Sequence, residues 1–182
     1  MKCQDCMYLT NDTCSLKSCL YGSDNKTLTE CVRKVYEHYF KGEKTEYDPQ
    51  DFKSVKNVST IMGGSVKPKE GGLWASPVKS PLNWKKLCEN GNECEWIQNG
   101  SFQFTLKPYA EILEIKSVKQ LKELPQTDNR FLERVCLDFE ELSKIYDAIE
   151  VFVTYDPKLY WYLYGWDCDS ILVMNPDVID IL

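Results

Sequence analysis

The chain has 182 residues, of which 43% are hydrophobic, and a formal net charge of −6 at pH 7. This length allows one sizeable core with a small appended module, and the acidic balance excludes a protein that binds nucleic acid or anionic membranes over its whole surface. No apolar run approaches the roughly 18 residues of a membrane span, and the start MKCQDCMYL has no signal-peptide core, so we expect a cytoplasmic protein without membrane contact.

Residues 1–26 contain four closely spaced cysteines among turn-forming residues. Cys3, Cys6, Cys14 and Cys19 follow the pattern C-x2-C-x7-C-x4-C, and we call these four residues the cysteine cluster. Two such pairs supply the four thiolates that Zn2+ prefers in a closed structural site. The cluster therefore predicts a zinc knuckle that folds residues 1–26, with Cys31 as an alternative ligand. Reduced thiols and disulfides are the other interpretations.

A helix is predicted over residues 28–41, joining the knuckle to the rest of the chain. Thr27 and Glu30 have the spacing of a capping box, apolar residues recur at helical intervals, and Gly42 can end the helix. His38, the one histidine of the chain, is expected to be a partly exposed residue of this helix. If the segment is extended instead, His38 becomes a candidate functional residue.

Residues 27–182 are predicted to form one α+β domain. Residues 43–57 indicate a loop with a short extended piece, because they combine a proline with alternating polar residues. Beyond residue 71, short runs rich in β-branched and aromatic residues predict strands, and two segments predict helices. The strand runs are GLWAS (72–76), SFQFTL (101–106), AEILEI (110–115), AIEVFVTY (148–155) and SILVM (170–174), and the helical segments are PLNWKKLCEN (81–90) and DFEELSKIYD (138–147).

Two adjacent glycines, Gly71 and Gly72, lead into the first of these strands. Glycine permits a positive φ and the close approach of another group, as at the edge of a pocket. Trp74 and Ser76 then fall on one side of the strand, where they can hold a planar ring that forms hydrogen bonds. The alternative is a core tryptophan beside a small polar residue.

A second aromatic run, residues 159–176, contains two carboxylates, Asp167 and Asp169. The period of a strand would place both on the same side, where one carboxylate can meet a cationic or oxocarbenium-like centre. An aromatic edge with two solvated acids is the alternative.

Four further cysteines lack metal-ligand spacing. Since the chain has one histidine to act as a base, a Cys-His hydrolase is disfavoured, and we expect Cys88, Cys94, Cys136 and Cys168 to be small buried side chains.

Several runs together resemble a group of bacterial and phage proteins similar to the ADP-ribosyltransferase fold. The runs are YDPQDFKSVKN, KPKEGGLWASP, YDAI and YGWDCDSILVMNP, together with Trp84 and Cys88, and the resemblance covers residues 45–182. In such proteins a glycine-aromatic strand forms one wall of the nicotinamide pocket, an Arg or His on the first strand binds NAD, and an acid on a later strand orients the ribose. For the basic residue, this chain offers His38.

The resemblance implies mixed and antiparallel sheets and a cleft for NAD or an ADP-ribose-like ligand. Trp74 would stack on nicotinamide, Ser76 would bond its amide or ribose, Asp169 would stabilise developing positive charge, and Lys67 or Lys69 would meet the pyrophosphate. The implied activity is transfer of ADP-ribose to a macromolecular target, protein or nucleic acid, in toxin or phage-host conflict. Because the late strand has no Gln-x-Glu or Glu-x-Glu, a cleft that binds without transfer stays open.

The rival interpretation is a non-catalytic interaction module. Residues 53–86 carry seven lysines against Glu70, and short cysteine-rich modules beside lysines serve in nucleic-acid recognition. In this interpretation the knuckle and the lysines contact nucleic acid or an acidic protein partner, and the tryptophan-rich region is a docking surface.

Overall fold

The computed structural model describes residues 9–10, 13–14, 34–40, 46–58, 69–91, 95–128, 134–163 and 165–182. The chain divides into two compact units, Met1–Lys34 and Val35–Leu182. In the first unit, β1 (Leu9–Thr10) pairs antiparallel with β2 (Thr13–Cys14). The other three members of the cysteine cluster, and Cys31, lie outside the described residues. The zinc site therefore stays a prediction.

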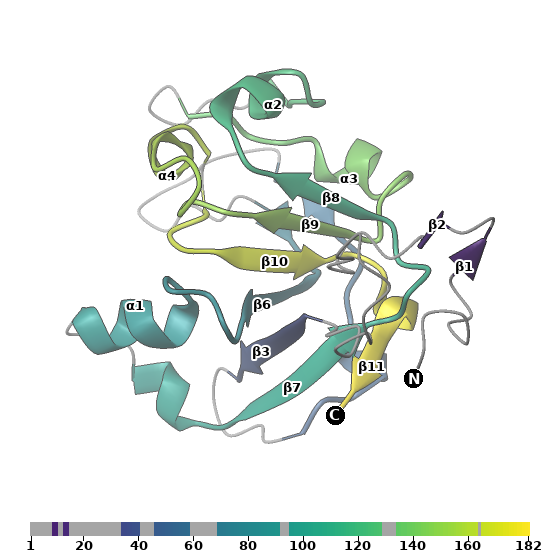
Figure 1. The fold of residues 1–182 in the computed structure, drawn as a ribbon, viewed down its shortest axis with the longest axis vertical. Helices are drawn as coiled ribbons and strands as arrows, with labels where there is room; N and C mark the ends of the chain where they lie inside the picture. The colour runs from purple at the N-terminus through teal and green to yellow at the C-terminus, as the bar shows by residue number, and fades with distance from the viewer. Residues whose placement is uncertain are drawn as a thin grey trace. The chain divides into compact units, whose positions relative to one another are not determined.

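A seven-stranded mixed sheet forms the centre of the second unit. Its neighbours are antiparallel except for the parallel pair β8 and β9, which confirms the α+β class. In spatial order the strands are β11 (Ile179–Ile181), β7 (Ser101–Leu106), β3 (Val35–Tyr39), β6 (Leu73–Pro77), β10 (Ser170–Val173), β9 (Ala148–Val151) and β8 (Ile112–Ile115) (Figure 1).

All five predicted strand runs overlap a strand of this sheet, and both predicted helical segments contain a helix. Those helices are α1 (Trp84–Asn90) and α3 (Phe139–Leu142). Asp138 caps α3, because its carboxylate accepts the amide of Glu141 at 3.0 Å. Two further helices, α2 (Val118–Lys122) and α4 (Lys158–Tyr162), were not among the predicted elements.

The predicted helix over residues 28–41 is wrong where the structure describes it. Residues 35–39 form β3, which pairs with β7 along all five residues and with β6 through Tyr36 and Glu37. The segment VYEHY is rich in β-branched and aromatic residues, and a place between two partner strands favours extension over helical spacing. His38 therefore lies on a strand.

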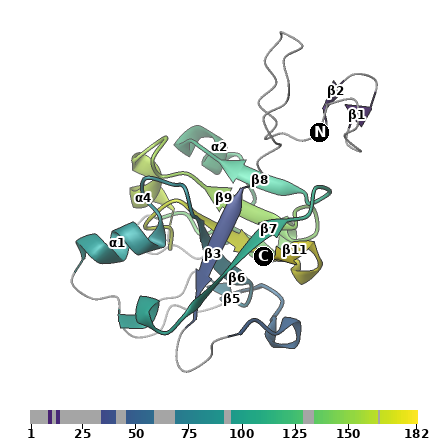
Figure 2. The same ribbon diagram turned by 60° about the horizontal axis from the view of Figure 1, so that its bottom comes forward.

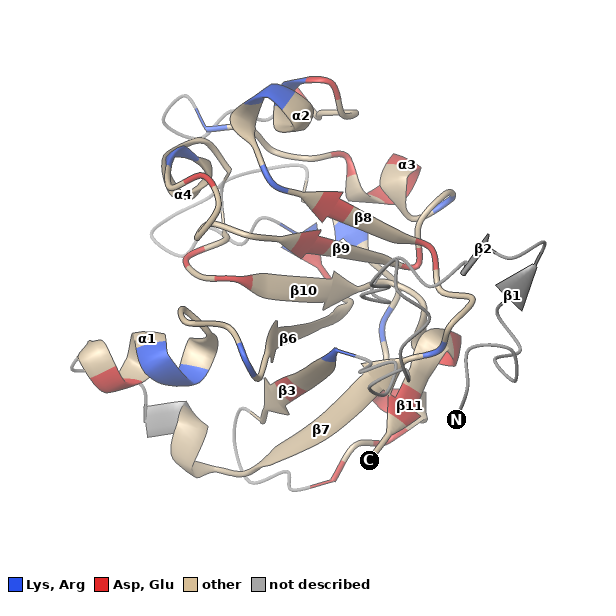
Figure 3. Cartoon of the chain, viewed as in Figure 1, with Lys and Arg blue, Asp and Glu red and all other residues tan. Residues whose placement is uncertain are grey.

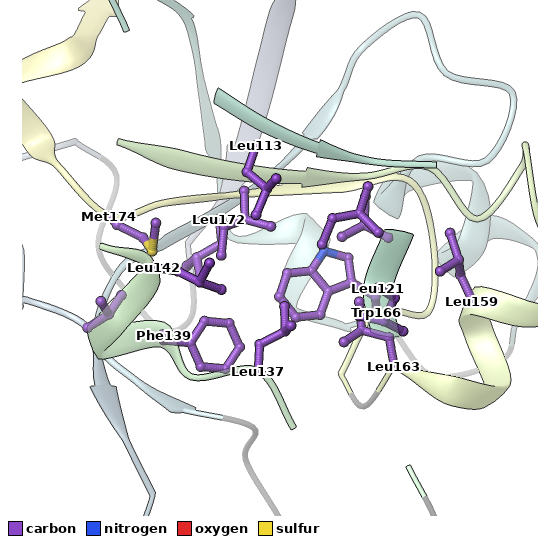
Figure 4. Close-up of a cluster of buried hydrophobic side chains, with 14 of the residues drawn as sticks. Leu113, Leu121, Leu137, Phe139, Leu142, Leu159, Leu163, Trp166, Leu172 and Met174 are labelled. Atoms are coloured by element: carbon purple, nitrogen blue, oxygen red, sulfur yellow. The ribbon is translucent and has the colours of Figure 1, made fainter. Parts of the chain in front are cut away.

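The two faces of the sheet carry separate cores. On one face, Leu172 of β10 packs into a cluster around Trp166, which is fully buried. Helices α2, α3 and α4 cover this face, since each contributes a buried side chain to the cluster (Figure 4). On the other face, Ile171 packs with Tyr36 and Phe104. Alternation along the strands therefore assigns neighbouring residues to different surroundings.

Among the described residues, none of the helices has the length and apolar character needed to cross a bilayer.

Candidate ligand pocket

The paired glycines form a turn against which another part of the chain packs closely. Gly71 and Gly72 have φ values of 67° and 68°. The amide of Gly72 donates to the carbonyl of Lys53 at 2.7 Å, and a Cβ on Gly71 would overlap the carbonyl of Ser54. A Cβ on Gly72 would lie 2.9 Å from a methyl group of Val55. Glycine is therefore required both for the backbone conformation and for the contact with residues 53–55.

The same turn borders an open pocket of about 340 Å3. Its other walls are β3, which supplies His38, and the loop before β4 (Lys56–Asn57), which contains the 3-10 helix η2 (Pro49–Asp51). Figure 2 shows β3 beside β6, the strand that follows the turn. The lining residues are His38, Phe40, Tyr47, Asp48, Asp51, Phe52, Lys53, Gly71, Gly72 and Leu73.

The imidazole of His38 is fixed by a backbone acceptor. Its Nδ1 lies 2.5 Å from the carbonyl oxygen of Trp74, and since a carbonyl can only accept, Nδ1 carries the hydrogen. The ring contacts Phe40 edge-on at 5.4 Å and Phe102 at 5.4 Å. The half-buried histidine is thus held in one orientation at the side of the pocket.

Tyr47 brings a buried hydroxyl group to the pocket wall. Its ring stacks on Phe102 with centroids 4.9 Å apart, and its Oη has no hydrogen-bond partner among the described residues. Burial, together with the nearby carboxylates of Asp177 and Asp48, raises the pKa of Tyr47. The phenol is therefore a protonated donor, which a ligand acceptor can satisfy.

Trp74 and Ser76 lie on one side of β6, but that side does not face the pocket. Trp74 packs edge-on against Trp166 at 4.5 Å, within the core beneath the helices. Ser76 is 2% exposed, and its hydroxyl accepts the amide of Trp84 at 3.1 Å. Both residues are engaged in packing and do not form a pocket wall.

Of the two predicted phosphate-binding lysines, the one that the structure describes does not line the pocket. Lys69 is 4% exposed, donates to the carbonyl of Gly71, and lies 5.0 Å from the ring centroid of Trp74. Lys67 lies outside the described residues. Lys53, which was not predicted to meet the pyrophosphate, is exposed and lines the pocket.

Asp169 is a buried carboxylate that joins three segments of the chain. It is 2% exposed, whereas Asp167 is exposed. The prediction that the two acids lie on the same side, in one environment, is therefore wrong. One oxygen of Asp169 accepts the amide of Thr154 at 3.0 Å, and the other accepts the hydroxyls of Thr154 at 2.6 Å and Ser80 at 2.8 Å. These hydrogen bonds hold the segments around Ser80, Thr154 and Asp169 together, which is a structural role.

Three of the four remaining cysteines are buried as expected, and Cys94 lies outside the described residues. Cys88 is nevertheless disulfide-bonded, which corrects its interpretation as a simple apolar side chain. Burial raises the pKa of the Cys168 thiol to about 12, so it is not a thiolate nucleophile at neutral pH. Within the described part of the chain, no three His, Cys, Asp or Glu side chains gather to hold a metal ion.

The structure thus brings His38 and the glycine turn to one pocket and places Trp74, Ser76 and Asp169 elsewhere. Phe40, Tyr47 and Phe52 line the pocket but were not predicted as site residues. For Tyr47 and Phe52, the aromatic residues around Pro49 in YDPQDF were a usable signal.

Comparison of the chain with protein-family models, curated proteins and solved structures finds no match.

Proposed function

We propose that the pocket beside the glycine turn binds NAD or an ADP-ribose-like nucleotide, and that the protein transfers ADP-ribose to a macromolecular target. The observation that carries this proposal is the position of His38. It lies on the strand next to β6 and borders the same pocket as Gly71 and Gly72. The resemblance to ADP-ribosyltransferases implies an Arg or His on the first strand that binds NAD, and a glycine-aromatic strand that forms one wall of the pocket.

The composition of the pocket supports a planar, phosphorylated ligand. The rings of Phe40, Tyr47 and Phe52 offer apolar surface to a nicotinamide or adenine ring. The Tyr47 hydroxyl can donate to a carboxamide oxygen or ring nitrogen, and the Lys53 ammonium can meet a phosphate. A volume of about 340 Å3 is near the lower end of the range for small-molecule sites, roughly 300–1,000 Å3. One nucleoside half would therefore lie inside, and the rest would extend through the open side.

The transfer itself needs a group that stabilises positive charge on the ribose. The bond from C1′ to the nicotinamide nitrogen breaks, nicotinamide leaves as a neutral molecule, and a target nucleophile bonds to C1′ as it loses its proton to a base. Asp48 and Asp51 are the carboxylates that border the pocket. Asp48 has a structural task, since it caps η2 by accepting the amide of Gln50 at 2.9 Å. We assign the electrostatic role to Asp51 in place of Asp169, because Asp51 lines the pocket and Asp169 does not.

The test compares Tyr47→Phe with the wild type by calorimetric titration of NAD, ADP-ribose and nicotinamide. Tyr47→Phe removes a hydroxyl group that bonds to nothing described in the free protein, so stability should be unchanged or slightly higher. Loss of a hydrogen bond of about 1 kcal/mol should weaken ligand binding about fivefold. Tyr155→Phe is the matched control, because Tyr155 is 66% exposed and does not line the pocket.

Two outcomes contradict the proposal in different ways. If none of the three ligands binds to the wild type, the nucleotide assignment is wrong. If NAD binds but Tyr47→Phe and His38→Ala bind it as tightly as the wild type, the ligand occupies another site. The transfer step is tested separately from binding by measuring the release of nicotinamide from bound NAD. The wild type should release nicotinamide, and Asp51→Asn should not.

A further inference from the structure

A strip of aromatic side chains lies exposed around α4. Tyr155, Tyr160, Trp161 and Tyr162 are 66%, 37%, 66% and 40% exposed, and we call these four residues the aromatic strip. They are half of the eight large hydrophobic side chains that are exposed in the described part of the chain. The helix is anchored from beneath by Leu159, which is fully buried. The strip is therefore presented on a fixed support.

The rings of the strip have accessible faces. Tyr160 and Trp161 are nearly perpendicular, with an interplanar angle of 89° and centroids 5.0 Å apart. A perpendicular pair covers at most one face of one ring, so it leaves flat aromatic surface in contact with water. Exposed aromatic surface of this kind costs solvation free energy unless a partner covers it.

Lysines of α2 and its flank border the strip. The Lys122 Nζ lies 5.5 Å from the ring centroid of Tyr162, and the Lys116 Nζ lies 5.9 Å from that of Tyr155. Lys119 of α2 and Lys158 at the start of α4 add two more cations on these elements, as the blue segments in Figure 3 show. Residues 114–123 and 155–162 together carry four lysines against three acids, in a chain whose net charge is −6.

We propose that this surface binds single-stranded nucleic acid, with bases stacked on Trp161 and the tyrosines and with phosphates paired to Lys119 and Lys122. Each base stacked on an aromatic ring strengthens binding by about fivefold or more, and any base can supply the ring. Lysines interleaved with aromatic residues suit a chain of alternating bases and phosphates. A duplex keeps its bases inside, so it cannot use the strip in this way.

The local charge favours single-stranded nucleic acid over an uncharged partner at the aromatic strip. An anionic polymer is attracted to a surface on which exposed aromatic rings lie beside cations, although the whole molecule is acidic. The proposal does not depend on the pocket, so each can fail while the other stands.

The experiment measures fluorescence anisotropy of labelled DNA and RNA strands of about ten nucleotides, with the full chain, over a range of salt concentrations. Trp161→Ala should raise the Kd at least about fivefold, whereas Trp161→Phe should retain most of the affinity because it keeps a stacking face. Lys122→Gln should lower the salt slope by about 0.7, the effect of one phosphate contact on a single strand.

Two matched controls locate the effect. Tyr109→Ala removes an aromatic residue that is 65% exposed elsewhere on the domain, and Lys85→Gln removes an exposed lysine of α1. Both should bind as the wild type does. Equal losses in the controls, or loss with Lys85→Gln alone, would overturn the proposal, as would equal affinity for duplex and single strand. If no strand binds but the wild type self-associates through Trp161, the surface serves protein contact and the proposal is wrong.

Discussion

Replacing Asp169 with asparagine tests whether this residue supports the fold or the chemistry. The substitution keeps the shape of the side chain but exchanges one carboxylate oxygen for an NH2 group. In the structure, Oδ2 accepts two hydroxyl groups, those of Thr154 and Ser80, and Oδ1 accepts the Thr154 amide. Asparagine cannot accept all three hydrogen bonds in either orientation of its amide.

The expected cost follows from these three contacts. A hydrogen bond to a charged group contributes about 1.5–3 kcal/mol, and a buried donor left without its acceptor costs about 1–3 kcal/mol. If the NH2 group of the substituted side chain faces the two hydroxyls, they must turn to accept and their own hydrogens lose a partner. If the NH2 group faces the Thr154 amide, two donors oppose each other. We therefore expect Asp169→Asn to lower the free energy of unfolding by about 3 kcal/mol.

Urea unfolding measured by tryptophan fluorescence provides the assay. A loss of about 3 kcal/mol should lower the midpoint temperature in a parallel thermal scan by roughly 6–12 °C for a chain of this size. Asp167→Asn is the matched control, since Asp167 is exposed and should change stability by less than about 0.5 kcal/mol. The reasoning is refuted if Asp169→Asn is as stable as the wild type, and a loss of NAD turnover in that stable variant would restore Asp169 as a catalytic residue.

In the same urea assay, Gly71→Ala should destabilise the protein far more than Gly100→Ala. Both positions have a positive φ, but a Cβ would meet backbone atoms at Gly71 and open space at Gly100. Equal losses of stability would mean that backbone strain alone, about 1–2 kcal/mol, explains the glycine. Iodoacetamide should label Cys168 in the native protein far more slowly than in urea, because its pKa of about 12 and its burial suppress the thiolate, and mass spectrometry of the labelled peptide would expose rapid native labelling. Despite the opposing effect of burial, hydrogen bonds from the Glu141 amide and the Asn57 side chain lower the pKa of Asp138 from 3.8; its stabilisation is therefore present above about pH 4 and lost as the pH falls through the lowered pKa. The stability difference between wild type and Asp138→Asn should narrow in acid, and a constant difference would contradict this. Metal analysis of the purified protein should find one zinc per chain, and removal of zinc by a chelator should unfold the region of the cysteine cluster; metal-free protein with freely titrating cluster thiols would end that prediction.

The sequence correctly predicted those elements whose conformation depends mainly on a few consecutive residues and little on the segments they pack against. The run SFQFTL coincides with β7, Ser101–Leu106, because alternating aromatic and polar residues favour a half-buried strand at almost any place in a sheet. The predicted helical segment DFEELSKIYD contains its own start signal, because the Asp138 carboxylate accepts the amide of Glu141 within one turn. In both cases a few consecutive residues contain the whole signal.

The site depends on contacts that no short run contains. His38 reaches the pocket because β3 pairs with strands that begin more than 30 residues later, and these pairings overrule a helical spacing. Asp169 looked like a catalytic acid in the sequence, yet one of its partners, Ser80, lies 89 residues away. The pocket wall that includes Tyr47 and Lys53 depends on the glycine turn, because residues 53–55 pack against Gly71 and Gly72. That contact spans a stretch of chain too long for a local pattern to indicate it.

The position of β10 between β6 and β9 has a consequence for the order of folding. Both neighbours precede β10 in the sequence, so a growing chain makes them before the strand that links them. Until residues 170–173 leave the ribosome, β6 and β9 each have an unpaired edge, and the half built on β3, β6 and β7 cannot join the pair β8 and β9. Such edges are templates for misassociation between nascent chains. We therefore expect synthesis arrested before residue 170 to give an aggregation-prone intermediate, which a chaperone would have to protect.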